Sequence, residues 1–394
     1  MNRTLIFNGK VITPYRVINN GSVLVEDGKI VQIAEGKIPT SECTVIDAKG
    51  LYISPGFIDI HTHGGGGHDF MDGTVEAYLG AAKMHAKHGT TALVPTTVTS
   101  TMENLKETFD IYSKAKATKN KGAKLLGLHL EGPYFSMEQR GAQDPRYIKN
   151  PVREEYEEIL SWSDDVIRWS AAPELDGAME FGRFLKEKNI LPSIGHSNAI
   201  YEDVIEAFEN GYTHITHLYS GMSGVRRINA YRYAGVIESA FLIDEMTVEI
   251  IADGAHLPAS LLKLIYKIKG ADKIALVTDS MRAAGMPEGE SILGSIKDGQ
   301  RVIVEDGVAK LMDRTAFAGS VATADRLVRT MINIAEVPFI DAIRMMTITP
   351  AKIIKIDDKK GSIAVGKDAD LVIFDEDINI KFTMVEGEIV YSCQ

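Results

Sequence analysis

The hydrophobic and polar positions divide the chain into three parts. Up to about residue 50, short runs alternate between apolar and polar side chains, with Asn8-Gly9 and Asp27-Gly28 as hairpin signals between them. This pattern predicts a small β unit. Its strands are expected at Thr4–Phe7, Lys10–Ile12, Ser22–Glu26, Ile30–Ala34 and Thr44–Asp47.

Beyond Leu51, β-rich apolar runs alternate with stretches whose apolar residues recur at the helical period. The helical stretches include Thr74–Lys87, Met102–Ala117, Arg153–Trp162, Tyr201–Asn210 and Ala259–Lys269. The β runs are Phe57–His61, Thr91–Pro95, Lys124–Leu130, Val166–Ala171, Ile190–Ile194, His214–Thr216, Thr247–Ala252 and Ile274–Thr278. These eight runs, each followed by a helical stretch, predict a (β/α)8 barrel of the TIM type in the α/β class. An open doubly wound sheet is the alternative.

The last part returns to short strands. Arg301–Glu305 and Val308–Met312 bracket Asp306-Gly307 as a hairpin, and Ala322–Ile334 and Ile340–Thr347 have the helical period. Strands are then expected at Asp370–Phe374, Ile380–Val385 and Glu388–Tyr391, with a turn at Glu386-Gly387. Because the N-terminal β unit is short, we expect both chain ends to form one small β-sandwich domain. The predicted domains are residues 1–52 and 358–394 for this β domain and residues 53–357 for the barrel.

Composition narrows the class of protein. With 394 residues, 45% hydrophobic and 25% charged, the chain can form one large domain and a smaller one. Cys43 and Cys393 are the only cysteines, which excludes a disulfide framework and finger-type zinc ligation. A net charge of −11 argues against nucleic acid or an anionic membrane as a partner. No signal peptide and no window of about 18 apolar residues is found, so we expect a cytoplasmic protein.

The polar residues that follow the β runs carry the candidate chemistry. Side chains alternate along a strand, so His61 and His63 project the same way. Enzymes with this barrel place catalytic groups at the C-terminal ends of the strands. Metal-competent side chains stand there after the first (His61, His63), third (Glu131), fifth (His196), sixth (His217), seventh (His256) and eighth (Asp279) runs.

One such residue alone is more often structural than functional, and it is the shared position of the whole set that favours a metal site. Imidazole and carboxylate without cysteine suit zinc, iron(II) or another first-row divalent ion. Such an ion activates water and polarises a carbonyl, which hydrolysis of an unactivated amide requires. The remaining histidines lie on helices, within strands or beside the glycine loop, and we interpret them as structural: His68, His85, His88, His129 and His214.

The same residues lie in motifs that resemble the amidohydrolase superfamily and, within it, the family of N-acetylglucosamine-6-phosphate deacetylases. The matching stretches are PGFIDIHTHGGGG, LHLEGPYF, RGAQDP, IGHSNA, THITHLYSGM, IADGAH, LVTDSMRAAGM, AFAGS and GKDADLVIFD. Together they cover essentially the whole chain. HLEGP combined with GHS, HLY and IADGAH is far more specific than His-x-His alone.

The resemblance implies a role for each matching residue. Glu131, His196 and His217 would hold the principal metal. His61 and His63 would hold a second one with Glu131 bridging, so that one or two divalent ions bind per chain. Asp279 would complete the metal site and act as general acid and base. Substrate contacts are implied at Ala142, Gln143, Ser220, Gly221, Arg232, His256, Phe317, Ala318 and Gly319. Arg232 would bind phosphate, in the active site of the neighbouring subunit of a homodimer.

One stretch departs from the family pattern. Many members read His-Leu-Tyr-Asn-Ala-Met, whereas this chain has Ser220-Gly221 in place of Asn-Ala, and SGVRRINAYRYAG replaces the usual Arg-Glu-Pro-Gly run. This difference concerns the sugar and phosphate contacts rather than the hydrolysis. Arg226 or Arg227 is therefore an alternative to Arg232.

These features predict metal-dependent hydrolysis of the N-acetyl group of N-acetylglucosamine 6-phosphate, in amino-sugar catabolism and cell-wall sugar recycling. Asp279 would take a proton from water and return it to the amine, with His256 helping to polarise the carbonyl. The alternatives are the galactosamine epimer as substrate, or a cyclic amidase or deaminase of the superfamily. Many cyclic-amide hydrolases use a carboxylated lysine on the fourth strand, and VIRWSAAPE has no lysine. A binding protein that had lost its metals would lack several ligands, and all of them are present here.

Overall fold

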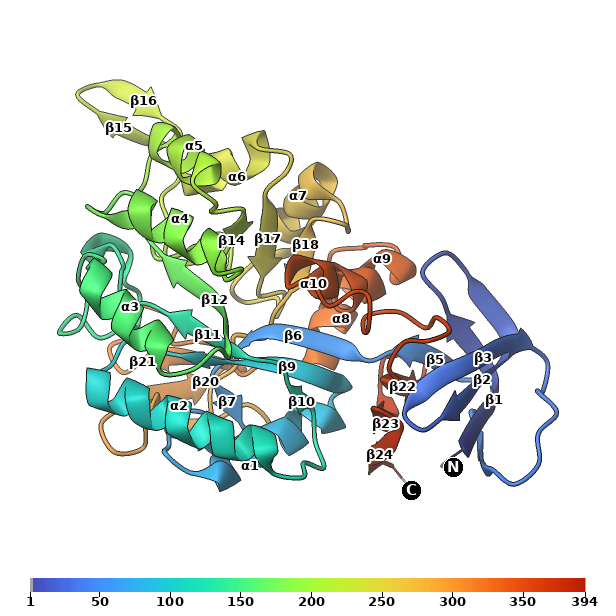
Figure 1. The fold of residues 1–394 in the computed structure, drawn as a ribbon. Helices are drawn as coiled ribbons and strands as arrows, with labels where there is room; N and C mark the ends of the chain where they lie inside the picture. Colours follow the sequence, from blue (N-terminus) through green and yellow to red (C-terminus); the bar gives the residue numbers. More distant parts are fainter. Residues whose placement is uncertain (1–2, 394) are drawn as a thin grey trace.

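Parallel strands surrounded by helices form the larger part of the chain, as the computed structural model of residues 3–393 shows (Figure 1). The strands follow one another around the barrel in chain order, each parallel to the next. They are β6 (Phe57–Thr62), β9 (Thr90–Thr97), β11 (Leu128–Glu131), β12 (Val166–Ala171), β13 (Leu191–Ile194), β14 (His214–Ile215), β17 (Thr247–Ile250) and β18 (Ile274–Leu276). They coincide with the predicted runs, and the short β10 (Lys124–Leu125) pairs beside them with β9.

The first and last strands of the barrel are joined by hydrogen bonds. The amide of Asp279 donates to the carbonyl of His61 at 2.9 Å, and the amide of His63 donates to the carbonyl of Ser280 at 2.8 Å. An open doubly wound sheet keeps its first and last strands apart, so that alternative is wrong. The predicted (β/α)8 barrel is confirmed.

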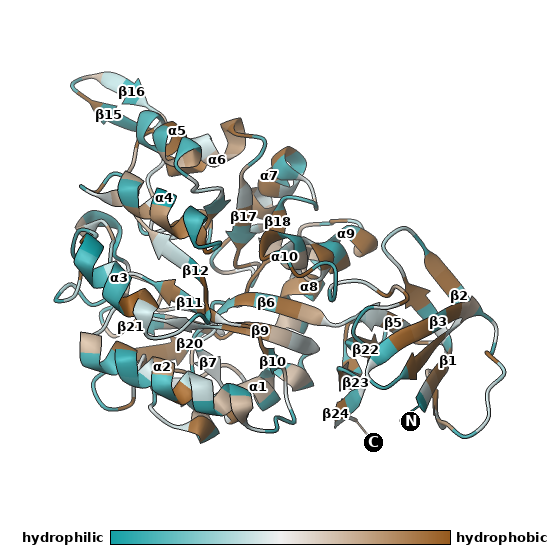
Figure 2. Ribbon diagram, in the orientation of Figure 1, coloured by the Kyte–Doolittle hydropathy of each residue, from teal (hydrophilic) through white to brown (hydrophobic). Residues whose placement is uncertain are grey.

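Helices surround the barrel with their polar faces outward. They are α1 (Val75–Lys87), α2 (Met102–Ala117), α3 (Arg153–Ser161), α4 (Ala178–Glu187), α5 (Tyr201–Glu209), α6 (Val236–Leu242), α7 (Ala259–Lys269), α8 (Ala324–Asn333), α9 (Phe339–Met345) and α10 (Ile348–Ile353). Figure 2 shows hydrophilic residues on outer helices such as α3 and hydrophobic ones on β6. Thr74 and Thr101 begin α1 and α2 as N-caps, each accepting a backbone N–H. No helix in the described part of the chain is long and apolar enough to cross a membrane.

The two chain ends form one eight-stranded sheet beside the barrel, in the order β24-β23-β22-β5-β1-β2-β3 with β4 also paired to β1. Its strands are β1 (Arg3–Ile12), β2 (Val17–Glu26), β3 (Lys29–Glu35), β4 (Thr44–Asp47), β5 (Tyr52–Pro55), β22 (Leu371–Phe374), β23 (Ile380–Val385) and β24 (Glu388–Ser392). The sheet folds back around a core that includes Ile6, Val23, Ile53, Leu371 and Met384. Because β5 belongs to this sheet, the junction with the barrel lies at Gly56, slightly beyond the predicted boundary at residue 52.

One predicted hairpin is wrong. The Asn8-Gly9 pair lies inside β1, where the register shifts between Ile6 and Gly9 and Asn8 has a φ of 57°. The pair is therefore a bulge, and the Asn8 amide is held by a 2.8 Å hydrogen bond to Asp47 of β4. The pairs at Asp27-Gly28 and Asp306-Gly307 do connect antiparallel strands, and both residues of each pair have positive φ, as the turn requires.

Two excursions leave the C-terminal ends of the barrel strands. A three-stranded sheet of β19 (Gly289–Leu293), β20 (Gln300–Glu305) and β21 (Val308–Leu311) lies between β18 and α8. A hairpin of β15 (Arg226–Ile228) and β16 (Tyr231–Tyr233) follows β14 and stands out from the body of the molecule in Figure 1. Smaller elements near the same end are β7 (Gly64–Gly65), β8 (His68–Asp69) and the 3-10 turn Met137–Gln139.

Candidate metal centre and active site

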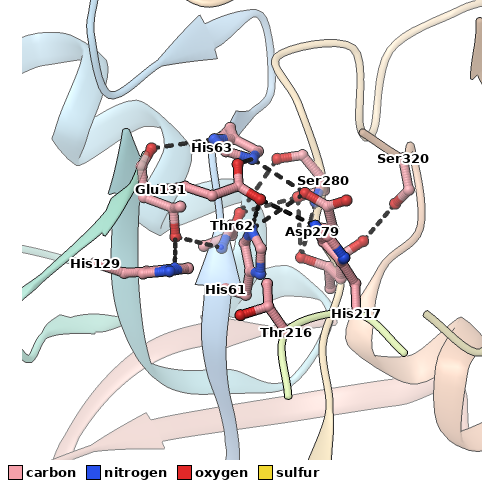
Figure 3. Close-up of polar contacts among 12 residues, drawn as sticks. His61, Thr62, His63, His129, Glu131, Thr216, His217, Asp279, Ser280 and Ser320 are labelled. Atoms are coloured by element: carbon pink, nitrogen blue, oxygen red, sulfur yellow. Dashed lines mark hydrogen bonds and ion pairs between the residues drawn. The ribbon is translucent and has the colours of Figure 1, made fainter. Parts of the chain in front are cut away.

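Two groups of metal-competent side chains meet at the C-terminal ends of the barrel strands (Figure 3). One group is Glu131, His196 and His217, the other is His61, His63 and Asp279, and all six residues are buried. Within each group the candidate ligand atoms lie within 4.8 Å of one another. The structure therefore brings together all six residues that the sequence predicts as metal ligands.

Glu131 lies between the two groups. Its Oε1 is 3.2 Å from Nε2 of His196 and 3.0 Å from Nε2 of His217. The same carboxylate approaches Nε2 of His61 at 3.6 Å and Nε2 of His63 at 3.4 Å. A carboxylate in this position can bridge two cations, as the resemblance implies.

The backbone at several of these strand ends is in the left-handed region. The φ angles are 48° at His196, 28° at His217 and 47° at Asp279, although none of these residues is glycine. Such conformations cost about 1 to 3 kcal/mol each and collect at functional sites, where the surrounding structure holds them. At Asp279 two hydrogen bonds do so: its amide donates to the His61 carbonyl, and its carbonyl accepts the Ser320 amide at 2.7 Å.

The protonation of the rings fits a cation at the centre. Carbonyl oxygens can only accept, so Nδ1 of His63 donates to the Thr96 carbonyl at 3.2 Å and Nδ1 of His196 to the Gln139 carbonyl at 2.9 Å. In the neutral form that binds a metal, each ring would then direct an unprotonated Nε2 inward. Nε2 of His61 is buried and has no hydrogen-bond partner among residues 3–393. A divalent ion would supply the missing partner, so the donor set fits the metal that the family implies.

Negative charge dominates the centre when no cation is bound. Burial alone would lower the pKa of His63, but the neighbouring Asp279, Glu131 and Asp69 raise it to about 9. Burial would raise the pKa of Glu131, yet the charge of His61 and the hydrogen bonds from His196 and His217 hold it well below its usual range. A concentrated negative potential of this kind favours a cation.

Two predicted substrate contacts are held firmly by their neighbours. Gln143 donates to Oε2 of Glu131 at 2.7 Å and accepts the Thr99 amide at 2.8 Å, so both ends of its amide are occupied. Nδ1 of His256 lies 2.8 Å from the carboxylate of Asp253, which leaves Nε2 for a substrate. The His256 ring also packs on Phe317, with ring centroids 4.3 Å apart.

An open cavity of about 290 Å³ lies directly over the ligand groups. The predicted residues that line it are Ala142, Gln143, Ser220, Gly221, His256, Phe317 and Gly319. Residues that the sequence analysis did not single out also line it: Val98, Gly141, Tyr219, Leu293 and Ala316. Leu293 belongs to β19, which the sequence pattern did not predict.

Two predicted substrate residues lie away from the cavity. Ala318 is fully buried, pairs through its amide with the Ala309 carbonyl, and packs in the core of the β19–β21 sheet. Arg232 is exposed on the projecting hairpin, where it lies opposite Arg227. Arg226 donates to the Asn198 carbonyl at 2.7 Å. Among the described residues that line the cavity, none is lysine or arginine.

The remaining histidines make other contacts. His129 bonds Ser170 and Thr96, His214 bonds Thr247, His85 bonds the Gly64 carbonyl, and His88 pairs with Asp325. Neither these four histidines nor His68 belongs to a potential ligand group within residues 3–393. Burial lowers the pKa of His85 to about 4, so this ring is neutral at physiological pH.

Comparisons with known proteins agree with this geometry. A model of the amidohydrolase family matches residues 52–390. An N-acetylglucosamine-6-phosphate deacetylase from Bacillus subtilis is 35% identical, over 98% of this chain and 97% of the relative. An N-acetylgalactosamine-6-phosphate deacetylase from Escherichia coli is 30% identical, over 95% of this chain and 98% of the relative. The crystal structure of N-acetylglucosamine-6-phosphate deacetylase from Pasteurella multocida superposes with a TM-score of 0.91 at 31% identity, covering 98% of this chain and 99% of that one.

Proposed function

The chain belongs to the amidohydrolase family, and from this premise we propose that it hydrolyses the N-acetyl group of N-acetylglucosamine 6-phosphate to glucosamine 6-phosphate and acetate. The observation that carries the proposal is the double ligand group beneath an open cavity, with Asp279 and His256 facing that cavity. Relatives with this activity match along nearly the whole chain. The reaction belongs to amino-sugar metabolism.

A bound divalent ion would activate water and polarise the acetyl carbonyl at this centre. Asp279 is placed to move the proton, because its carboxylate lines the cavity and lies 3.0 Å from Nε2 of His63. It would take a proton from water and return it to the departing amine nitrogen. His256 would donate from Nε2 to the carbonyl oxygen, and Asp253 fixes the ring for that purpose. Donation from Nε2 requires a proton on that nitrogen. Because Nδ1 donates to Asp253, the ring in this role would carry a proton on both nitrogens, as an imidazolium.

We propose that two ions bind per chain, with zinc or iron(II) as the metal. Imidazole and carboxylate ligands suit either ion. Elemental analysis of protein purified without chelator, compared with the double variant His61→Asn/His63→Asn, tests the number. The variant should retain the ion at Glu131, His196 and His217 and lose the other. An unchanged metal content would remove the histidine pair from the site.

The phosphate contact is proposed to come from a second subunit. The described lining of the cavity has no lysine or arginine, whereas Arg227 and Arg232 are exposed on the β15–β16 hairpin. Tyr231 of this hairpin and Val225 just before it are also exposed, at 73% and 62%. A dianionic phosphate needs such cations, and the planar guanidinium suits its oxygens. A homodimer in which the hairpin reaches the neighbouring cavity would supply them.

We also propose a cytoplasmic location, where phosphorylated sugars are retained because their charge opposes passage through a bilayer.

The second candidate substrate is N-acetylgalactosamine 6-phosphate. It is supported by the E. coli relative and by Ser220-Gly221, which line the cavity and depart from the usual family sequence. Acetate release should be measured with metal-loaded protein on both 6-phosphates and on unphosphorylated N-acetylglucosamine. We expect the highest kcat/KM for N-acetylglucosamine 6-phosphate. Preference for the galactosamine epimer would replace the substrate assignment, and failure on all three would refute the deacetylase proposal.

A further inference from the structure

A buried ion pair lies inside the barrel directly beneath the metal centre. Arg168 of β12 and Glu249 of β17 have no exposed surface, and Nη1 of the arginine donates to Oε1 of the glutamate. The guanidinium also donates to Ser193 Oγ at 3.0 Å, to Thr216 Oγ1 at 2.9 Å and to the Ile60 carbonyl at 3.2 Å. Desolvating two charges is costly, and apolar residues of similar volume often serve a core as well or better. Packing alone therefore does not account for the Arg168–Glu249 pair.

Glu249 contacts both ligand groups through its second oxygen. Oε2 accepts from Nδ1 of His61 at 3.2 Å and from the backbone amide of His217 at 3.2 Å. A carboxylate can only accept, so this contact favours the tautomer of the neutral ring with its proton on Nδ1 and a free lone pair on Nε2. That Nε2 is the buried atom without a hydrogen-bond partner, 3.4 Å from Asp279 and 3.6 Å from Glu131. Glu249 thus selects the tautomer and the orientation in which His61 can bind a metal.

The other ligand rings are supported differently. His63 and His196 donate from Nδ1 to main-chain carbonyls, as described above. Nδ1 of His217 has no partner among the described residues. Of the four ligand histidines in the described chain, His61 alone is backed by a carboxylate. A carboxylate behind an imidazole raises its basicity, and removing such a partner typically weakens metal binding about 10- to 100-fold.

We propose that Arg168 and Glu249 are positioning residues that set the affinity of the second metal position, formed by His61, His63 and Asp279. Glu249 fixes His61, and Arg168 neutralises Glu249 and ties it to β6, β13 and β14. The ligand concerned is a divalent cation. The inference rests on the proposed two-ion centre, but metal binding can be measured without any substrate.

The test is a titration of Zn²⁺ alone into chelator-treated protein, resolved into a first and a second binding step. The main variant removes both partners, because removing one alone leaves a buried charge unpaired. Arg168→Met/Glu249→Leu removes both charges together and should preserve the fold. Glu249→Gln keeps an oxygen that can accept from His61 but removes the charge, and it decides the matter if the double variant does not fold.

We expect the double variant to bind the second Zn²⁺ about 10- to 100-fold more weakly than the unmodified protein, with the first step changed much less. The affinity of Glu249→Gln for the second Zn²⁺ should lie between that of the double variant and that of the unmodified protein. The matched control is Asp370→Asn, which breaks the buried Lys360–Asp370 pair in the β domain. It should lower the melting temperature while leaving both Zn²⁺ affinities unchanged.

Equal weakening of both steps, or no weakening of the second, would overturn the positioning role. So would a single Zn²⁺ per unmodified chain, an outcome that leaves the deacetylase proposal standing. The two proposals can also fail separately in the other direction. If the variants selectively lose the second ion but the unmodified, metal-loaded protein releases no acetate, the positioning role is supported and the proposed function is refuted.

Discussion

The floor of the cavity and its rim are built on different principles. The floor consists of buried side chains at the ends of β6, β11, β13, β14 and β18, held by strand pairing and by main-chain hydrogen bonds. The rim consists of excursions from the barrel: the β19–β21 sheet, which contributes Leu293, and residues 219–221, which lead into the β15–β16 hairpin that projects beyond the cavity. The floor is thus determined by the barrel itself, whereas the rim can change without disturbing the metal centre. The ligand motifs that carry the family resemblance lie in the floor, whereas the stretch that differs from the family pattern forms the hairpin.

The largest expected effect comes from the floor. Asp279→Asn keeps the shape of the side chain but removes the base, and general acid–base catalysis is typically worth about 10² to 10⁴ in rate. We expect kcat to fall by that factor while at least one metal and the fold are retained. Steady-state kinetics with elemental analysis is the measurement. Asp325→Asn, which affects the distant contacts with His88 and Arg329, is the control and should turn over normally. Near-normal turnover by Asp279→Asn would remove it from the mechanism.

His256 lines the cavity but is not one of the six potential metal ligands, so its replacement tests whether a residue beside the metal centre takes part in the chemistry. A donor to a developing oxyanion contributes about 10² to 10³ in kcat, so His256→Ala should lose that much. KM should change far less. Phe317→Ala removes the ring that packs on His256 and is the matched variant, for which we expect a smaller loss. A loss expressed only in KM would assign His256 to substrate binding.

The hairpin tests the rim. If Arg232 carries the phosphate contact, Arg232→Ala should weaken kcat/KM for the 6-phosphate by roughly 2 to 3 kcal/mol, the scale of a charge-assisted hydrogen bond. Activity on the unphosphorylated sugar should hardly change. Arg301→Ala, at an exposed position of β20, is the control for loss of surface charge. No loss on either substrate would move the role to Arg226 or Arg227, and an equal loss on both would indicate misfolding or another role.

The smallest effect is expected where rim and floor touch. Gly221 has a φ of 56°, and a Cβ there would lie 2.8 Å from Nδ1 of His196 and 2.9 Å from the Gln139 carbonyl. Gly221→Ala should cost about 1 kcal/mol of stability for the left-handed backbone, plus the cost of moving His196. Gly36→Ala has a similar φ and no atom within 4 Å of the new Cβ, so it measures the backbone cost alone. Thermal unfolding of both variants, with and without metal, separates the two contributions. Identical shifts of the melting temperature would mean that the added methyl group at position 221 does not displace His196.

The pattern of the sequence predicts the barrel well because its strands are continuous apolar runs and its ligands follow those runs directly. Elements with a weaker period were missed. The β19 strand is short and half-exposed, and α6 has only seven residues, too few to show a helical repeat. Asn8-Gly9 has the residues of a turn, but β4 and β5 pair with β1 on either side of it and keep the strand extended as a bulge.

In the candidate site, too, some residues could be predicted from the sequence pattern and others could not. Residues at strand ends could be predicted because their position alone indicates their role. Arg168 and Glu249 lie within strand runs and face the interior of the barrel, where nothing in the local pattern shows that they meet. The residues of the β15–β16 hairpin show two short exposed strands but not the direction in which the hairpin projects. Arg232 therefore could be named from a resemblance but not placed.

The most direct test of the account is acetate release from N-acetylglucosamine 6-phosphate as divalent metal is returned to chelator-treated protein. We expect negligible release without metal and recovery of activity on addition of Zn²⁺ or Fe²⁺. We expect no recovery when both His196 and His217 are replaced by asparagine, because the principal metal position is then lost. Full activity in the chelated protein, or full recovery in the His196→Asn/His217→Asn variant, would contradict the assignment of the metal centre as the active site.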